Sequence, residues 1–206
     1  MEAIARKTMI EYSRMLYEKG YMPGIDGNIS MRVDESTAIV TPSGVCKGVL
    51  QQDDLVLMSM DGEQLSGDRK PTSEAPMHLA ALRLREDIDA VIHAHSPQVL
   101  SFAIARKPID TRCAPFAYEH LKEVGYVRYF PPGSDGLHNA VNEAIEAGYA
   151  AFILEQHGSM VLGKTMADAF AKTDLLEAYA GMLLGAAVLG GPYVMTDSEI
   201  AEIHGG

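Results

Sequence analysis

The sequence predicts a layered α/β domain with a mixed sheet, and three observations support this fold class. Segments with the 3.6-residue hydrophobic period of helices alternate along the chain with short apolar runs typical of strands. Two of these runs flank Asp34-Glu35-Ser36, a turn sequence that predicts a hairpin, and a hairpin pairs its strands antiparallel. No repeat or Pro/Gly/Ser-rich linker divides the 206 residues, so we expect one domain over residues 1–206.

The first half of the chain is predicted to open with a helix over residues 2–19. Ala5, Met9 and Leu16 recur there at helical spacing, and Gly20 stands where a helix often ends. The further elements expected in this half are strands over 28–33, 37–41, 54–60 and 89–95, a helix over 76–85, and a helix that begins at Ser96-Pro97 with a hydroxyl cap.

Hydroxyl residues mark the helices predicted in the second half, because a Ser or Thr side chain can accept a hydrogen bond from a backbone N–H of the first turn. Thr196 and Glu199 also have the three-residue spacing of a capping box. The elements expected are a helix from Ser134 to Gly148, a buried strand over 150–154, a long helix from Thr165 to Gly190 and a short helix from Thr196.

Composition and charge exclude several classes of protein. With 47% hydrophobic and 22% charged residues, the chain has the make-up of a globular protein rather than a disordered or fibrous one. Cys46 and Cys113 are the only cysteines, so a disulfide scaffold is excluded and a reduced, cytoplasmic location is expected. A net charge of −11 argues against nucleic-acid and membrane partners, which need a basic surface. No signal or membrane-spanning segment is predicted.

The pair His93 and His95 is the sharpest chemical feature. Residues i and i+2 of a strand point to the same face, so the predicted strand aims both imidazoles at one place. Imidazole is a frequent ligand of zinc and similar ions, and a catalytic zinc needs about three protein ligands and an open position. The alternative is that both histidines are ordinary polar residues at a strand end.

Glu74 and His157 are candidates for the remaining ligands. The predicted helix from Glu74 to Arg85 is about 18 Å long, and the predicted strand from Asp89 to His95 runs back in the opposite direction for about 23 Å. The end of the strand therefore lies near the start of the helix, which brings Glu74 close to the histidine pair. His157 follows a predicted strand, where functional groups often lie. Alternatively, Glu74 only complements a helix dipole and His157 is a lone loop residue. His78, one turn after Glu74, is expected on the helix surface.

Three short polar segments form a candidate phosphate site. Gly27-Asn28 and Ser43-Gly44 lie at the two ends of the predicted hairpin, and pairing of its strands brings them side by side. Thr72-Ser73 precedes a predicted helix, where backbone N–H groups and the helix dipole favour an anion. Each segment alone could be an ordinary turn or helix cap. Because Thr72-Ser73 adjoins Glu74, the anion and metal sites are expected to share one pocket.

Five motifs in this order make the sequence recognisable. They are Gly27-Asn28-Ile29-Ser30, Thr41-Pro42-Ser43-Gly44, Thr72-Ser73-Glu74, His93-Ala94-His95 and Glu155-Gln156-His157-Gly158. Over residues 4–203 the chain resembles the class II aldolase and adducin-head family, and most closely its fuculose-phosphate aldolase branch. The resemblance implies a three-layer αβα sandwich around a mixed, largely antiparallel central sheet. It also implies a homotetramer with active sites at the subunit interfaces.

The resemblance further implies roles for the motif residues. His93, His95 and His157 would be zinc ligands, with Mn²⁺ or Co²⁺ able to substitute, and Glu74 would be both a fourth ligand at rest and the acid/base. The implied reaction is reversible cleavage of a ketose 1-phosphate to dihydroxyacetone phosphate and an aldehyde, through a metal-stabilised enediolate. The residues implied to hold the substrate phosphate are Gly27, Asn28, Ser43, Gly44, Thr72 and Ser73.

The chain departs from the family pattern in two places. The family aldolase carries a tyrosine on its C-terminal tail, whereas this sequence reads Ile203-His204-Gly205-Gly206 there. The 4-epimerase branch uses an aspartate after the His-x-His helix, and none aligns within residues 113–120. Distal proton transfer is therefore left to Tyr118, Glu119, His120 or a neighbouring subunit.

Other functions on the same scaffold stay open. Epimerases, dehydratases and decarboxylases share this fold, so membership of the family does not fix the reaction. The adducin head is a non-catalytic interaction module, which is expected to lack the complete ligand set present here. A purely structural metal site is disfavoured, because closed zinc sites usually contain cysteine and neither cysteine lies within the motifs.

Overall fold

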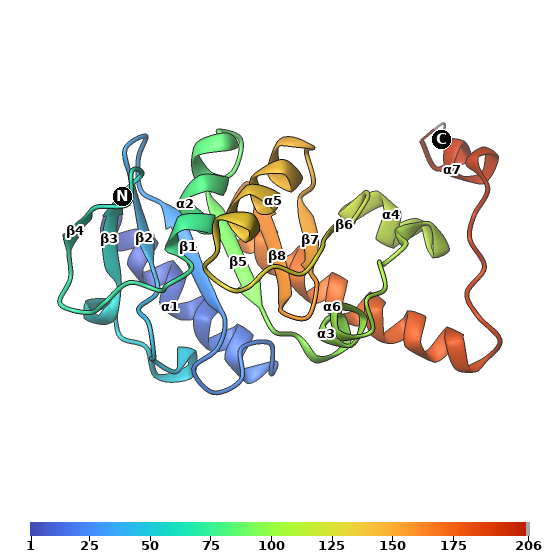
Figure 1. Cartoon of the computed structure of the whole chain (residues 1–206), viewed down its shortest axis with the longest axis horizontal. Coiled ribbons are helices and arrows are strands. Elements are labelled where there is room, and N and C mark those ends of the chain that lie inside the picture. The colour runs from blue at the N-terminus through green and yellow to red at the C-terminus, as the bar shows by residue number, and fades with distance from the viewer. Residues whose placement is uncertain (205–206) are drawn as a thin grey trace.

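The computed structural model describes residues 1–204, which are organised around one eight-stranded sheet (Figure 1). The strand order is β4-β3-β2-β1-β5-β8-β7-β6, and every neighbouring pair is antiparallel except the parallel pair β6 and β7. The sheet is therefore mixed and largely antiparallel, as predicted. The strands are β1 (Asn28–Arg32), β2 (Thr37–Val40), β3 (Val56–Ser59), β4 (Gln64–Ser66), β5 (Ala90–Ala94), β6 (Gly125–Val127), β7 (Ala151–Leu154) and β8 (Gly158–Gly163).

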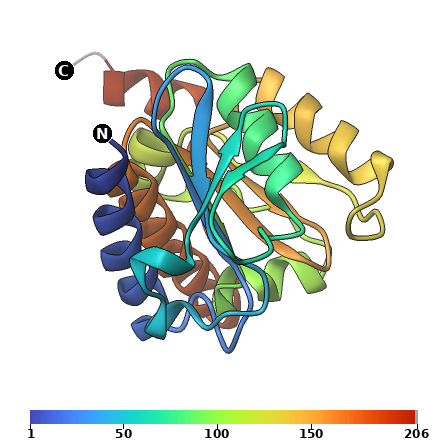
Figure 2. The same cartoon turned by 90° about the vertical axis from the view of Figure 1, so that its left-hand side faces the viewer.

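Helices cover both faces of the sheet, which gives the three predicted layers (Figure 2). Two of them, α2 (Ala75–Leu84) and α5 (Asp135–Glu146), pack on one face. The other face carries α1 (Glu2–Glu18), α3 (Pro97–Ile104), α4 (Pro115–Leu121) and α6 (Met166–Val188). The last helix, α7 (Asp197–His204), lies beside α4 at one end of the molecule.

The alternation of side chains along the central strands decides which polar residues face α2. Ile92 of β5 packs in the apolar layer beneath α1 and α6, so its neighbour His93 points to the opposite face. Ile29 of β1 packs in the same layer as Ile92. Asn28 and Ser30, on either side of Ile29, therefore point toward α2 as His93 does.

The helices and strands predicted from the sequence are all present, with ends that differ by two residues or fewer. The predicted cap of α5 is confirmed, because Ser134 Oγ accepts a hydrogen bond from the backbone N–H of Leu137 at 3.2 Å. The capping box of α7 is confirmed too. Thr196 N–H donates to the Glu199 carboxylate at 2.7 Å, and Glu199 N–H donates to Thr196 Oγ1 at 3.3 Å.

The predicted cap of α3 is wrong. Ser96 Oγ is buried and has no hydrogen-bond partner among the described residues. Instead, the carboxylate of Glu177 on α6 accepts hydrogen bonds from the backbone N–H groups of Gln98 at 2.9 Å and Val99 at 3.0 Å. A carboxylate supplied by another helix thus satisfies the start of α3 and complements its dipole.

Four of the described α-helices and strands have no counterpart in the sequence prediction: β4, β6, β8 and α4. The three short 3₁₀ helices, Lys47–Val49, Gln52–Asp54 and Thr111–Cys113, have none either. The strands β4 and β6 have three residues each, too few to show a period. Every residue of β8 is buried, so its sequence shows no alternation of polar and apolar residues.

None of the described helices is both long and apolar enough to cross a membrane. The prediction about the C-terminal sequence rests partly on Gly205 and Gly206, which lie outside the described residues.

Candidate active site

His93 lies near the end of β5, and the neighbouring strand fixes the orientation of its ring. The ring is fully buried, and its Nδ1–H donates to the backbone carbonyl of Ser159 on β8 at 2.9 Å. In the neutral ring Nε2 is then a bare acceptor, and it lies 3.0 Å from Nε2 of His95. Burial lowers the pKa of His93 to about 3, which keeps the ring neutral near pH 7.

His95 follows β5 and is held by the backbone. Its N–H donates to the carbonyl of Tyr21 at 2.9 Å. On the side chain, Nδ1 lies 3.8 Å from a carboxylate oxygen of the exposed Asp26. Burial lowers the pKa of His95 below its ordinary value, so this ring too favours the neutral form that binds metals.

His157 lies in the tight turn between β7 and β8. Gln156 takes a left-handed backbone with φ of 57°, and His157 N–H donates to the carbonyl of Leu154 at 3.0 Å. This turn sets the ring of His157 with its centroid 4.7 Å from that of His93. The next residue, Gly158, has no room for a side chain, because a Cβ there would lie 2.6 Å from the carbonyl oxygen of Ala94.

Glu74 immediately precedes α2 and brings its carboxylate to the cluster. Oε1 lies 3.0 Å from Nε2 of His157, and Oε2 lies 3.3 Å from Nε2 of His93. The sequence prediction places Glu74 beside His93 and His95, whereas its two close imidazoles are those of His93 and His157. Burial alone would raise the pKa of Glu74, but these two imidazoles and the amide of Asn28 hold it below its usual range.

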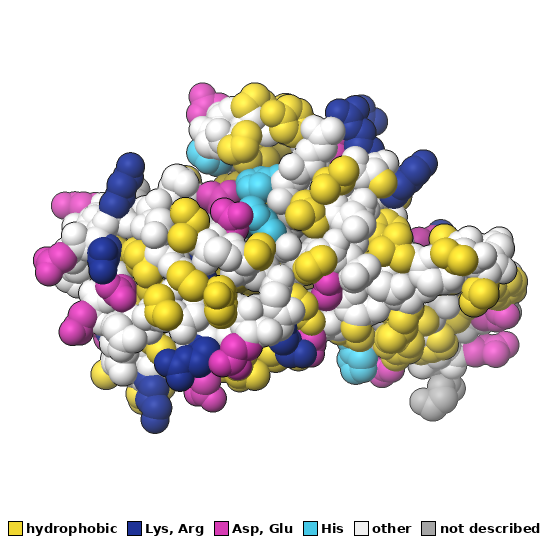
Figure 3. Space-filling model, turned by 90° about the horizontal axis from the view of Figure 1, so that it is seen from below, with side chains coloured by type: hydrophobic (Ala, Val, Ile, Leu, Met, Phe, Trp, Pro, Cys, Tyr) yellow, Lys and Arg dark blue, Asp and Glu magenta, His cyan; other side chains and the backbone are white. Residues whose placement is uncertain are grey.

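The three imidazoles form a donor set that fits a divalent metal ion. One ring nitrogen from each of His93, His95 and His157 lies within 4.8 Å of the others. Three nitrogen ligands, an adjacent carboxylate and a ring oriented by a backbone carbonyl match the chemistry of a catalytic zinc site, and Mn²⁺ and Co²⁺ accept similar ligands. Figure 3 shows histidine side chains beside acidic ones in a recess on this face of the molecule, where a small ligand has access from solvent.

The segments expected to bind phosphate lie beside one another. Thr72 N–H donates to the carbonyl of Thr41 at 3.0 Å, and Ser43 N–H donates to that of Lys70 at 2.9 Å. These two backbone N–H groups hold the loops together and are therefore not free to bind a phosphate. Ser43 and Ser73, which carry hydroxyl groups, are exposed. Asn28 lies next to Glu74, because its Nδ2–H donates to Oε2 at 2.6 Å.

Gly27 needs to be glycine for two reasons. Its φ is 69°, in the left-handed region that side chains disfavour. A Cβ at this position would also lie 2.6 Å from Cγ of Met22 and 3.1 Å from the carbonyl oxygen of His93. The Gly27-Asn28 motif therefore sets a close approach between the start of β1 and the end of β5.

His78 corrects the sequence prediction, because it is fully buried between α2 and the sheet instead of lying on the helix surface. Its Nδ1 lies 2.8 Å from Ser30 Oγ, and its Nε2 lies 2.5 Å from Asn28 Oδ1. The sequence contains a signal for this contact. Glu74 and His78 have the spacing that places two side chains on one helix face, and Asn28 and Ser30 the spacing for one strand face.

Lys47 is a residue that sequence reasoning missed entirely. Only 2% of it is exposed, and its ammonium donates to the carbonyls of Ile25 at 2.7 Å and Val45 at 3.0 Å. Burial lowers its pKa, while the nearby Asp26 opposes that shift. Lys47 thereby ties the loop before Gly27 to the loop after Ser43. A single lysine at the start of a three-residue 3₁₀ helix, Lys47–Val49, carries no sequence pattern that would reveal this role.

The candidates for distal proton transfer do not meet Glu74 within this chain. Tyr118, Glu119 and His120 lie on α4. The apolar residues of α4, Ala117 and Leu121, pack with α6 on the sheet face opposite α2. The sheet therefore separates these candidates from the α2 side, where Glu74 lies.

Comparison with known proteins agrees with this architecture. The family model described as "Class II Aldolase and Adducin N-terminal domain" matches residues 7–184. An L-fuculose phosphate aldolase of Methanococcus maripaludis is 37% identical over 171 residues, which cover 83% of this chain and 91% of the relative. A 3-oxo-tetronate 4-phosphate decarboxylase of Haemophilus influenzae is 30% identical over 205 residues, covering 97% of this chain and 95% of the relative.

A solved structure supports the same relationship. The Escherichia coli protein YgbL, described as a candidate aldolase/epimerase/decarboxylase, superimposes with a TM-score of 0.89 at 29% identity and 98% coverage of both chains. The matched family model spans every histidine of the cluster as well as Glu74. The chain belongs to the class II aldolase and adducin N-terminal domain family, as the five sequence motifs predict.

Proposed function

We propose that the protein is a metal-dependent aldolase that reversibly cleaves a ketose 1-phosphate between C3 and C4 to dihydroxyacetone phosphate and an aldehyde. The observation that carries this proposal is the position of the Glu74 carboxylate, 3.0 Å from His157 and 3.3 Å from His93. Thr72-Ser73 directly precedes it in the chain. In this proposal a proton-transfer group, a metal donor set and an anion site share one region, as cleavage beside the carbonyl of a sugar phosphate requires.

The donor set supports zinc as the metal. In this proposal His93, His95 and His157 hold the ion, and Glu74 is the fourth ligand before substrate binds. Mn²⁺ or Co²⁺ can take the same ligands. A divalent ion at this place supplies Lewis-acid polarisation of the substrate carbonyl and stabilises negative charge on the oxygens beside the breaking bond.

Glu74 is suited to move the proton at the substrate carbon. In the condensation direction its ionised carboxylate takes a proton from the carbon of dihydroxyacetone phosphate that becomes C3, and cleavage returns that proton. The Asn28 amide, donating at 2.6 Å, holds the carboxylate in place.

The substrate phosphate is assigned to the loops beside Glu74. The exposed hydroxyls of Ser43 and Ser73 are available as donors, and the loops that carry them are joined by backbone hydrogen bonds. A helix start also favours an anion electrostatically. The full set proposed to hold the phosphate is Gly27, Asn28, Ser43, Gly44, Thr72 and Ser73.

A decarboxylase is the second candidate function. Its support is coverage, because the 3-oxo-tetronate 4-phosphate decarboxylase of Haemophilus influenzae aligns with 97% of the chain, against 83% for the Methanococcus maripaludis aldolase. Loss of CO₂ from a 3-oxo acid leaves negative charge on the same atoms as aldol cleavage. One arrangement of ligands and one proton donor therefore serve both reactions.

We further propose that the sites are completed in a homotetramer, at interfaces between subunits. Tyr118 and its neighbours on α4 lie across the sheet from Glu74 in one chain. A neighbouring subunit is then the source of the group that transfers the distal proton.

The reaction is tested by product analysis on the zinc-loaded protein. A panel of ketose 1-phosphates that differ in chain length and stereochemistry is assayed for dihydroxyacetone phosphate with a coupled dehydrogenase, with each unphosphorylated ketose as control. A 3-oxo-tetronate 4-phosphate is assayed in parallel for CO₂. Dihydroxyacetone phosphate from at least one ketose 1-phosphate is expected. Release of CO₂ with no dihydroxyacetone phosphate from any ketose would replace the aldolase assignment with the decarboxylase.

A further inference from the structure

A continuous line of buried polar side chains lies behind Glu74, between α2 and the sheet. Ser30 Oγ lies 2.8 Å from His78 Nδ1, His78 Nε2 lies 2.5 Å from Asn28 Oδ1, and Asn28 Nδ2 lies 2.6 Å from Glu74 Oε2. Ser30 and His78 are fully buried and Asn28 is 5% exposed. The proposed mechanism assigns no role to Ser30 or His78.

The chemistry of each group fixes the direction of every hydrogen bond in this line. An ionised carboxylate only accepts, so Asn28 must turn its N–H toward Glu74 and its carbonyl oxygen toward His78. That oxygen also only accepts, so Nε2 of His78 must carry a hydrogen. A neutral imidazole has one N–H, which leaves Nδ1 as an acceptor for the hydroxyl of Ser30.

The other tautomer of His78 breaks the line. If the hydrogen sat on Nδ1, the lone pair of Nε2 would face the carbonyl oxygen of Asn28 at 2.5 Å. The two ends of an amide have nearly the same shape, so the amide can rotate to give Nε2 a donor. Its oxygen would then face the carboxylate of Glu74, and two acceptors would repel each other.

We propose that His78 is a positioning residue, whose Nε2–H holds the Asn28 amide with its N–H on the carboxylate of Glu74 while its Nδ1 accepts from the hydroxyl of Ser30. This role rests on the proposed function only in that Glu74 transfers the proton. Burial lowers the pKa of His78 to about 4, which agrees with a neutral ring near pH 7. Each group in the line thereby donates a hydrogen bond to the next one, from Ser30 through His78 and Asn28 to the carboxylate of Glu74.

A pair of variants separates this role from simple packing. His78→Gln keeps an N–H group near the position of Nε2 and an oxygen for Ser30, whereas His78→Leu fills similar volume without a donor. We expect His78→Leu to lower kcat by about 100-fold, with a smaller rise in KM because Asn28 is also assigned to the phosphate, and His78→Gln to recover most of the loss in kcat. Equal losses in both variants, or none in His78→Leu, would overturn the proposal.

A matched control comes from the opposite side of the sheet. Thr173 on α6 is also buried and polar, and its Oγ1 donates to the carbonyl of Ala169 at 2.8 Å. Thr173→Val is expected to lower the melting temperature while leaving kcat unchanged. If it lowered kcat as much as His78→Leu does, the effect at His78 would be one of general stability.

Nuclear magnetic resonance tests the arrangement without any turnover. In ¹⁵N-histidine-labelled full-length protein, the His78 signals are assigned by their loss in His78→Gln. We expect a protonated Nε2 and an unprotonated Nδ1, both with and without Zn²⁺. In uniformly ¹⁵N-labelled protein, the Asn28 side-chain N–H signal, shifted by its bond to Glu74, should move toward the free-amide position in His78→Leu.

The two proposals fail in distinguishable ways. The positioning role is overturned if His78 is protonated at Nδ1, or if the Asn28 signal does not change in His78→Leu, even when the aldolase assay succeeds. If the expected tautomer and the Asn28 shift are observed but the protein cleaves no ketose 1-phosphate, the positioning role is supported and only the proposed reaction is wrong.

Discussion

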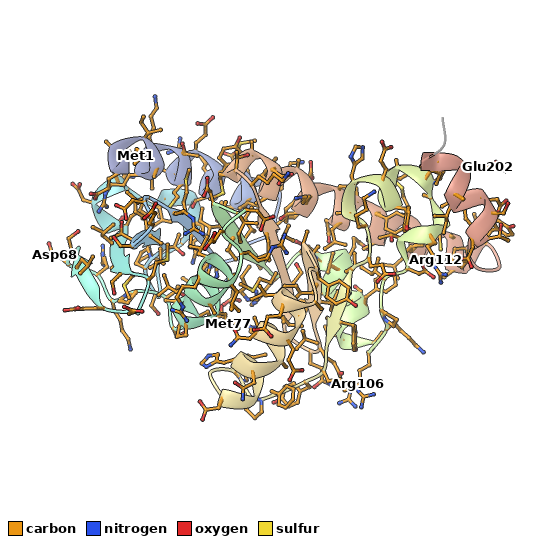
Figure 4. All side chains as sticks on the ribbon, turned by 90° about the horizontal axis from the view of Figure 1, so that it is seen from above. Met1, Asp68, Met77, Arg106, Arg112 and Glu202 are labelled. Carbon is orange, nitrogen blue, oxygen red and sulfur yellow. The ribbon has the colours of Figure 1, made fainter. Side chains whose placement is uncertain are left out.

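The polar cluster around Glu74 and the C-terminal arm, residues 182–204, are built in opposite ways. In the cluster, buried polar groups are held by partners on α2, β1, β5 and β8. The arm extends beyond the sheet, and Figure 4 places Arg112 and Glu202 together at that end of the molecule. Large apolar side chains on it are exposed, with 87% of Val188, 89% of Leu189 and 67% of Tyr193 open to solvent.

The two regions differ in what a single chain supplies. All three imidazoles of the metal donor set come from one chain, at the end of β5 and in the β7–β8 turn. The arm is joined to the rest by contacts such as the hydrogen bond from Met195 N–H to the carbonyl of Arg112 at 2.9 Å. Exposed apolar surface of this kind is typical of an interaction site, which agrees with the proposed tetramer.

The largest expected effect is loss of the metal. His93→Ala and His157→Ala each remove a ligand from a set of three imidazoles, so bound zinc should fall well below one ion per chain and activity should vanish with it. Metal analysis after gel filtration measures this. Full metal content in both variants would remove the cluster from the mechanism, whereas Leu189→Glu in the arm should bind zinc like the unmodified protein.

The next effect separates proton transfer from metal binding. Glu74→Gln keeps three imidazoles but removes the base, so kcat should fall by about 1,000-fold while zinc content changes little. Glu177→Gln is the matched control, because Glu177 is also a buried carboxylate but caps α3 on the other face. Near-normal turnover in Glu74→Gln would reduce Glu74 to a charge at the start of α2.

Acid should destabilise the cluster region before it affects the arm. The pKa of folded His78 is about 4, below its ordinary value of 6.5, so between these values the unfolded chain binds more protons. The stability due to neutral His78 is present above about pH 6.5 and is lost as pH falls toward 4, by about 3 kcal/mol at most.

Denaturant unfolding in the presence of a chelator checks this pH dependence. The free energy of unfolding should fall less steeply between pH 6.5 and 4 in His78→Gln than in the unmodified protein. Parallel slopes for the two proteins would show that His78 is not held neutral by burial.

A smaller effect is expected at the phosphate loops. Ser43→Ala removes one exposed hydroxyl from several groups that share the anion, so KM for a phosphorylated ketose should rise by about tenfold with little change in kcat. Steady-state kinetics with the phosphorylated and free sugars measures this. A similar rise for the free sugar would place Ser43 against another part of the substrate.

The smallest intrachain effect is expected in the arm. Val188→Asp places a charge on a residue that is 87% exposed, so the free energy of unfolding of one chain should change by about 0.5 kcal/mol or less. Light scattering should nevertheless show a smaller assembly, because the charge would be buried at the proposed interface. An unchanged assembly would assign the exposed apolar side chains another role.

The sequence by itself determined the layered fold, most element positions and the residues of the cluster. His93-x-His95 on a strand, Glu74 before a helix and His157 before Gly158 are local patterns, and each follows from the chain's own periodicity or spacing. The αβα sandwich followed from the five motifs taken together, because their order and spacing match one family.

Tertiary structure decided what each side chain touches. The spacing of Glu74 and His78 shows that they share a helix face, but burial of that face depends on β1 lying beneath it, with Asn28 and Ser30 turned toward α2. Glu74 meets His157 because β8 pairs with β5, which brings the β7–β8 turn beside the end of β5. Glu177 caps α3 in place of Ser96 because α6 supplies it from 79 residues along the chain. Periodicity specifies a face and a local spacing, whereas depth and partner are set by contacts between distant segments, which no local pattern encodes.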